Sequence, residues 1–259
     1  MTQNERLIWL IKYLLAENSR YSKVEIPDDI CEQFNLYRSL VNVRMPEPIS
    51  DEYLNVEDEY LQEEVSKKGI THINKLIPDS DDIYLWQGDI TTIDTDAIVN
   101  AANDQLLGCF CPCHACVDNC IHTFAGVRLR LECNKIMQKQ ICKGSAGKAK
   151  ITPAYNLPSE YVIHTVGPII NGTLKKSDKE LLESCYTECL KLSDTYDLKS
   201  ISFCCISTGE FHFPNDKAAE IAVNTVKEYK KKTNSKIKVI FNVFKDKDYK
   251  IYRELLCSD

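Results

Sequence analysis

The chain has 259 residues, of which 44% are hydrophobic and 27% charged, as in an ordinary globular protein. No apolar run approaches the roughly 20 residues that a membrane helix needs, and we find no signal-peptide pattern, so we expect a cytoplasmic protein with reduced cysteines and no membrane contact. Residues 1–80 carry 9 Lys and Arg against 15 Asp and Glu, whereas residues 81–259 carry 23 of each, which argues against a nucleic-acid surface and indicates a division at about residue 80.

The first unit, residues 1–80, is predicted to be a small helical extension. Apolar residues recur at helical spacing in three segments, over residues 4–16, 28–42 and 50–68. Asn4 and Ser50 are candidate N-caps, and Pro46 follows the end of the second helix. We find no chemistry-bearing motif in this segment, and we expect it to pack on the second unit and shape the rim of its site.

The second unit, residues 81–259, alternates strands with helices. The strands are expected over residues 83–87, 97–101, 149–152, 161–166, 201–206 and 238–244. The helices are expected over residues 117–138, 181–195, 216–232 and 248–256. This alternation predicts an α/β fold, a three-layer sandwich of helices around one sheet.

The stretch from residue 100 to 122 reads NAANDQLLGCFCPCHACVDNCIH and is the richest in reactive side chains. Three of them have the spacing C-x4-H-x-C: Cys109, His114 and Cys116. Thiolate and imidazole are the ligands that Zn²⁺ prefers, and three protein ligands leave one position open, which is typical of a catalytic site. A structural zinc with a fourth ligand from Cys111 or Cys113 is the alternative.

Most of the remaining cysteines are predicted to be small buried hydrophobes. These are Cys133, Cys142, Cys185, Cys189, Cys204, Cys205 and Cys257. Three of the histidines outside the metal loop, His122, His164 and His212, are also expected to be structural.

Three further motifs follow predicted strands: Gly88-Asp89-Ile90-Thr91, the NAAN sequence that ends at Asn103, and Ser207-Thr208-Gly209-Glu210-Phe211. Open α/β sheets bind ligands at such strand ends. Together with VD-x2-IH and VF-x4-Y-x-IY, these motifs resemble the macrodomain family, the ADP-ribose-binding modules. The resemblance covers about residues 83–256 and implies a macrodomain-type α/β/α sandwich with a mixed central sheet.

One departure narrows the resemblance. Where the common hydrolytic branch has a run of glycines, this chain has the longer cysteine-rich stretch from Gly108 to Cys116. That stretch and the helical extension, with LVNVRMPEPIS at residues 40–50, resemble the zinc-dependent macrodomains, whose members are protein-ADP-ribose hydrolases. The branch implies a linkage to acidic side chains. It also implies a sirtuin-type ADP-ribosyltransferase and a lipoylated carrier protein as partners.

Within this resemblance the adenosine contacts have a physical basis. Asp89 can accept a hydrogen bond from the adenine amino group, while the Ile90 backbone N–H can donate to a ring nitrogen. The alternative for Asp89 is a turn residue that caps the next segment. Asn103 can bind ribose hydroxyls through an amide that both donates and accepts.

The loop after the apolar strand is the predicted diphosphate cradle. Its successive backbone N–H groups surround a flexible glycine, and its members are Ser207, Thr208, Gly209, Glu210 and Phe211. Phe211 can cover the distal ribose. An ordinary strand-to-helix turn is the alternative for this motif taken alone.

Asp118 lies two residues beyond Cys116. It can orient a zinc-bound water, hydrogen-bond the ligand His114, or cap the following helix. The resemblance favours a place beside the distal ribose. We therefore predict Asp118 and Asn103 as the catalytic residues, with Val117 as a further ADP-ribose contact.

These predictions describe a zinc-dependent hydrolase that removes mono-ADP-ribose from modified protein side chains and releases ADP-ribose. One zinc ion per chain would polarise the C1 linkage and lower the pKa of the attacking water. The residues alone leave open whether the bond is an ester, an N-glycoside or an O-glycoside. The alternative function is a non-catalytic ADP-ribose reader whose zinc is structural and fully coordinated.

Overall fold

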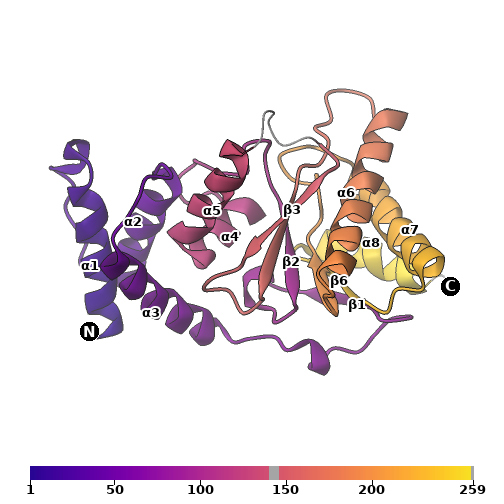
Figure 1. The fold of residues 1–259 in the computed structure, drawn as a ribbon, viewed down its shortest axis with the longest axis horizontal. Coiled ribbons are helices and arrows are strands. Elements are labelled where there is room, and N and C mark those ends of the chain that lie inside the picture. The colour runs from indigo at the N-terminus through magenta and orange to yellow at the C-terminus, as the bar shows by residue number, and fades with distance from the viewer. Residues whose placement is uncertain (140–145, 258–259) are drawn as a thin grey trace.

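A six-stranded mixed sheet lies at the centre of the protein, which we describe from a computed structural model over residues 1–139 and 146–257 (Figure 1). The strands are β1 (Ile83–Gln87), β2 (Ala97–Ala101), β3 (Ala149–Pro153), β4 (Tyr161–Thr165), β5 (Ser200–Phe203) and β6 (Lys238–Val243). Their order is β1-β6-β5-β2-β4-β3. All neighbours are parallel except β3, which runs antiparallel to β4.

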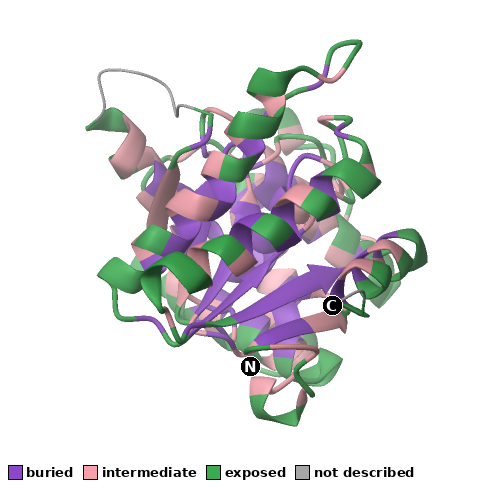
Figure 2. Ribbon diagram, turned by 90° about the vertical axis from the view of Figure 1, so that its right-hand side faces the viewer, coloured by how far each residue is buried: buried purple, intermediate pink, exposed green. Residues whose placement is uncertain are grey.

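Helices cover both faces of this sheet (Figure 1). On one side lie α4 (Val117–Ala125) and α5 (Val127–Gln138); on the other lie α6 (Lys176–Thr195), α7 (Asn215–Thr233) and α8 (Asp246–Cys257). Figure 2 shows buried strands between helices whose outward faces are exposed. The predicted three-layer α/β/α sandwich with a mixed sheet is confirmed.

The prediction of one helix over residues 117–138 is wrong. Gly126 separates α4 from α5. Its φ is 88°, a backbone conformation that residues other than glycine rarely adopt. A Cβ atom at this position would also lie 2.6 Å from a carboxylate oxygen of Glu57. The helical periodicity continues across the break, so the apolar pattern does not reveal it.

The N-terminal extension consists of α1 (Gln3–Ala16), α2 (Ile30–Val43) and α3 (Asp51–Lys68). Thr2, and not the predicted Asn4, caps α1, because its hydroxyl accepts from Glu5 N while the Glu5 carboxylate accepts from Thr2 N. Ser50 caps α3 as predicted. Short 3₁₀ helices lie at η1 (Ser19–Tyr21), η2 (Ile73–Lys75) and η3 (Ile90–Thr92).

The extension packs on α4 and α5, as expected. Phe34 of α2 stacks on Phe124 of α4, with ring centroids 6.1 Å apart. The buried guanidinium of Arg130 on α5 donates to the carbonyls of Val41 and Arg44 at the end of α2, at 2.7 and 2.6 Å. One continuous apolar cluster contains residues from both parts of the chain, while the division at residue 80 stays a prediction.

The cysteines outside the metal loop follow the prediction in part. Cys133, Cys185, Cys189 and Cys204 are buried and Cys205 is half-buried. Cys257 is exposed, so its prediction is wrong: it lies on the outer face of the last turn of α8. Cys142 lies outside the described residues. In the described chain, none of the helices is both long and apolar enough to cross a membrane.

Candidate active site and metal centre

The predicted binding motifs meet at one edge of the sheet. Because β1, β6, β5 and β2 are parallel neighbours, their carboxyl ends lie side by side. Asp89 follows β1, Phe244 follows β6, Ser207 follows β5 and Asn103 follows β2. Strands in a sheet are about 4.8 Å apart, so the three steps from β1 to β2 span about 14 Å. This edge is long enough for a ligand of dinucleotide size.

Asp89 lies at the outer end of this edge and already has partners. Its Oδ1 atom accepts from the N–H and hydroxyl of Thr91, at 3.0 and 2.7 Å, which caps η3. Its Oδ2 atom accepts from Lys68 Nζ at 2.9 Å. Burial acts to raise the pKa of Asp89, but the hydrogen bonds from Lys68 and Thr91 outweigh it, and the pKa is lowered. Asp89 therefore caps η3, and its carboxylate oxygens can still accept a further hydrogen bond from a ligand.

Two further features surround Asp89. The side chain of Ile90 is buried. Phe244 is 76% exposed directly after β6, and the Gly88 N–H donates to the carbonyl of its neighbour Val243 at 3.0 Å. An exposed aromatic ring at the end of β6, the strand next to β1, is a surface on which a flat base can stack. We did not single out Phe244 from the sequence, although it belongs to the VF-x4-Y motif.

The loop after β5 has an unusual backbone. Ser207 has a φ of 65° and a buried hydroxyl that has no hydrogen-bond partner in the described part of the chain. A Cβ atom on Gly167 would lie 2.0 Å from this hydroxyl, so only glycine there leaves room for it. Gly209 is open, with no heavy atom within 4 Å of a Cβ built on it. Thr208 and Phe211 are half-buried and Glu210 is exposed.

Asn103 holds its own loop together. Its amide nitrogen donates to the Gly108 carbonyl at 3.1 Å, and its amide oxygen accepts from Gln105 N at 3.0 Å. The side chain thus shapes the turn that leads into Cys109. An amide has further donor and acceptor capacity, so a ligand contact remains available.

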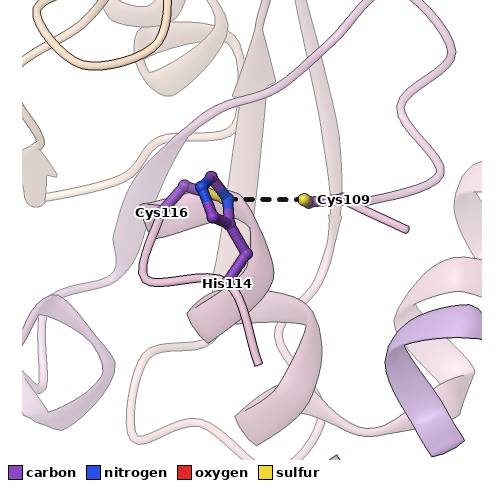
Figure 3. A group of neighbouring side chains, drawn as sticks. All are labelled: Cys109, His114 and Cys116. Carbon is purple, nitrogen blue, oxygen red and sulfur yellow. Dashed lines mark hydrogen bonds between the residues drawn. The ribbon is translucent and has the colours of Figure 1, made fainter. Parts of the chain in front are cut away.

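The spacing C-x4-H-x-C does bring three ligand atoms together. The side chains of Cys109, His114 and Cys116 place their ligand atoms within 4.8 Å of one another, as Figure 3 shows. Cys109 Sγ and His114 Nδ1 are 3.5 Å apart. A tetrahedral zinc, with bonds of about 2.3 Å to sulfur and 2.0 Å to nitrogen, would hold these two atoms about 3.5 Å apart. The donor set and its spacing therefore fit Zn²⁺.

The two extra cysteines of the loop point elsewhere. Cys113 Sγ lies 3.3 Å from the Asn35 carbonyl and 3.2 Å from Ser39 Oγ, both on α2. Cys111 is exposed and is not among the clustered ligand atoms. The geometry therefore favours three protein ligands and not four.

The second ring nitrogen of His114 faces the loop after β5. Its Nε2 atom lies 3.6 Å from Glu210 Oε1. With Nδ1 directed to Cys109 Sγ, Nε2 can carry the ring proton toward this carboxylate. Carboxylates in that position orient metal-binding imidazoles, so Glu210 connects the loop after β5 to the metal centre.

Asp118 lies in the first turn of α4, behind the metal loop. Its carboxylate is buried and accepts from Asn100 Nδ2 at 2.7 Å. Burial raises the pKa of Asp118 to about 6, and the Asn100 hydrogen bond opposes the shift. Cys116, not Asp118, is the N-cap of α4, because its sulfur accepts from Asn119 N at 3.4 Å. Val117 is the first residue of the helix and is half-buried.

A second possible metal site, which sequence reasoning missed, lies in the core. His122, Cys133 and His164 also place ligand atoms within 4.8 Å of one another, and all three are buried. Burial lowers the pKa of His164 to about 3 and that of His122 well below its usual value, so both rings are neutral. The only sequence signal is the apolar setting of each residue, which led us to treat them as structural.

Comparisons with known proteins agree with this geometry. The sequence model of the Macro domain family matches residues 99–222. A protein-ADP-ribose hydrolase of Treponema medium is 56% identical, over 99% of this chain and 100% of that protein. A protein-ADP-ribose hydrolase of Staphylococcus aureus (strain MSSA476) is 49% identical, over 98% of this chain and 96% of that protein.

The fold also has solved counterparts. The crystal structure of a Trypanosoma brucei macrodomain in complex with ADP-ribose superposes with a TM-score of 0.66 at 27% identity, covering 85% of this chain and 94% of that one. An Oceanobacillus iheyensis macrodomain mutant with ADPR gives a TM-score of 0.63 at 38% identity, over 68% of this chain and 91% of that one.

Proposed function

The chain belongs to the macrodomain family, and we propose that it uses zinc to remove mono-ADP-ribose from modified protein side chains. It is a protein-ADP-ribose hydrolase, as its near full-length relatives at 56% and 49% identity are. The observation that carries the zinc part of the proposal is the cluster of Cys109, His114 and Cys116 in the loop that follows β2. The use of zinc and the type of bond that is cleaved do not follow from the family assignment, so both are part of the proposal.

Of the two possible metal sites we assign the active-site ion to the Cys109 group. Its three residues are only half-buried, so a substrate can reach them. The group around His122 is buried and lies near the guanidinium of Arg130, whose charge opposes another positive charge there. The His164 ring is also engaged with Asn100 and Thr152, at 3.2 and 3.0 Å. Polar partners of this kind suit a structural role.

At the adenosine end the protein binds and orients. Asp89 accepts from the adenine amino group, the Ile90 N–H donates to the ring, and Phe244 offers an aromatic face to the base. The loop after β5 cradles the diphosphate with its backbone N–H groups. Its residues are Ser207, Thr208, Gly209, Glu210 and Phe211. The unpartnered Ser207 hydroxyl is a further donor for a phosphate oxygen.

At the ribose end Asp118 and Asn103 surround the reacting carbon. Asn100 holds the Asp118 carboxylate at 2.7 Å, so that it can accept from a ribose hydroxyl or orient the attacking water. The Glu210 carboxylate lies 3.6 Å from His114 Nε2 and can orient the imidazole when a closer approach forms a hydrogen bond. A zinc ion bound here supplies Lewis acidity at the ribose end of the site. Because the other end of the ligand is fixed, binding also orients the reacting centre.

The finer specificity rests on the family resemblance. We propose that the bond is the ester to an acidic side chain, and that a sirtuin-type ADP-ribosyltransferase and a lipoylated carrier protein are partners of this chain. An ester is the most readily hydrolysed of the three possible linkages. No described contact of this chain selects among target proteins.

The test combines metal analysis with turnover. Purified protein should contain about one zinc per chain, and chelation should stop release of ADP-ribose from a glutamate-modified protein while the circular dichroism spectrum stays folded. Cys116→Ser should lose the metal, whereas Cys111→Ser and Cys113→Ser should keep it. Chelated, folded protein that turns over at the original rate would favour the alternative, in which the ion is structural.

A further inference from the structure

Helix α2 of the extension contacts the metal loop directly. Arg38 Nη2 donates to the His114 carbonyl at 2.8 Å and to Asn119 Oδ1 at 2.7 Å, and Arg38 Nε donates to the same oxygen at 3.1 Å. These partners are 76 and 81 residues away in the sequence. Within residues 1–139 and 146–257, every hydrogen bond of the Arg38 guanidinium goes to this loop or to the first turns of α4.

Asn119, which accepts from Arg38, also contacts a second candidate metal ligand, Cys116. Its backbone N–H donates to Cys116 Sγ at 3.4 Å, and its amide nitrogen donates to the Cys111 carbonyl at 3.0 Å. The guanidinium of Arg38 therefore holds the backbone of one ligand, His114. It also holds the residue whose N–H is directed at the sulfur of another, Cys116.

The contact requires the shape of arginine. A guanidinium is planar and presents its donors in a fixed fork, so one side chain can reach two acceptors in a set direction. A lysine carries a similar charge but only a single flexible ammonium. Arg38 is also half-buried against α4, which reduces competition from water.

A second pair of contacts fastens the middle of the loop. Asn42 Oδ1 accepts from Cys113 N at 2.9 Å, and Asn42 Nδ2 donates to Thr123 Oγ1 at 3.0 Å. Cys113 has a positive φ of 52°, a conformation that the loop must be held in. Helix α2 thus supports both halves of the loop, before and after His114.

We propose that Arg38 is a positioning residue for the metal centre, so that the N-terminal extension completes the active site and does more than shape its rim. The inference rests on the proposed zinc site. Without the fork of Arg38, the three ligand atoms would sample more arrangements, and the zinc would bind more weakly and in altered geometry. Outer partners of metal ligands typically change metal affinity by about 10–100-fold.

The experiment compares Arg38→Met and Arg38→Lys with the exposed Arg20→Met as a matched control on the same extension. Zinc affinity is measured by competition with a chromophoric chelator, and ligand geometry by the visible spectrum of the cobalt-substituted protein. Both Arg38 variants should bind zinc about 10–100-fold more weakly, with shifted cobalt bands. The Arg20→Met control should have the zinc affinity and the cobalt spectrum of the wild type. All three variants should bind ADP-ribose with the affinity of the wild type.

The outcomes separate this inference from the proposed function. A wild-type protein that takes up no zinc overturns both. A zinc-binding wild type whose Arg38→Met variant has the same affinity and the same cobalt spectrum overturns the role of Arg38 alone. If the methionine variant does not fold, Arg38→Lys decides, because it keeps the charge and loses only the fork; full zinc affinity in that variant also overturns the inference.

Discussion

The carboxylate of Glu57 on α3 accepts a hydrogen bond from the backbone N–H of Val127, the first residue of α5, at 2.9 Å. The same carboxylate accepts from the hydroxyls of Tyr37 and Tyr53, at 2.8 and 3.1 Å, and it is fully buried. A side chain of the extension thus satisfies the open N-terminus of a helix in the α/β sandwich. The two parts of the chain are joined by a buried polar contact as well as by apolar packing.

The burial of the Glu57 carboxylate makes stability depend on pH. Burial raises the pKa of Glu57 to about 7, although the hydrogen bonds from Val127, Tyr37 and Tyr53 oppose the shift. The folded protein therefore holds a proton that the unfolded chain releases near pH 4.5, so Glu57 lowers the free energy of unfolding as the pH rises from about 4.5 to about 7. A shift of this size corresponds to about 3 kcal/mol across the window.

Glu57→Gln should remove this dependence. The difference in unfolding free energy between variant and wild type, measured by urea denaturation from pH 4.5 to 8, should move in favour of the variant as the pH rises. The exposed Glu52→Gln on the same helix should run parallel to the wild type. A Glu57→Gln difference that is constant across the window contradicts the assignment.

Gly126→Ala should strongly destabilise the protein. The substitution forces a φ of 88° on alanine and places its Cβ 2.6 Å from Glu57 Oε2. Gly69→Ala is the matched control, since Gly69 has a φ of 85° but no atom within 4 Å of a built Cβ. Backbone strain costs about 1–3 kcal/mol in both, so only Gly126→Ala should lose more than this in thermal or urea unfolding. If both variants lose the same unfolding free energy, the Glu57 side chain moves away from the new Cβ at no cost.

Asp89→Ala should weaken binding of free ADP-ribose. A hydrogen bond to a charged group contributes about 1.5–3 kcal/mol, which corresponds to roughly a 10- to 150-fold change in affinity by calorimetry. Lys68→Met keeps the carboxylate but removes its ion pair, which is 2.9 Å long, and the contact of the ammonium with the Phe124 ring. It should keep most of the affinity. Unchanged binding by Asp89→Ala would remove this residue from the site.

Asp118→Asn should slow hydrolysis and spare binding. The amide keeps the shape of the side chain beside Asn100, but it is a weaker acceptor and cannot take up a proton. General acid–base groups contribute about 10²–10⁴-fold, so kcat should fall by at least about 100-fold, with ADP-ribose affinity within a few-fold of the wild type. The exposed Asp216→Asn serves as the control. Wild-type turnover by Asp118→Asn would place the catalytic role elsewhere.

The prediction from sequence succeeded where residues close in the chain act together. The alternation of strands and helices implied the α/β sandwich. Apolar residues that repeat with the period of a helix or of a strand can be buried on one face only if the segment adopts that structure. The motifs after β1, β2 and β5 were expected at one edge, since parallel strands end on the same side. The spacing of Cys109, His114 and Cys116 was enough to bring their ligand atoms together, because a loop of eight residues has short reach.

The contacts between distant segments came only from the tertiary structure. Arg38 and Glu57 carry no motif, and their partners His114 and Val127 lie 76 and 70 residues away. Gly126 interrupts a helix whose apolar period continues, and the carboxylate that packs against the break, Glu57, comes from another helix. Such pairings depend on how α2 and α3 dock on α4 and α5. Periodicity marks which face of each helix is buried, but it does not identify the partner that buries it.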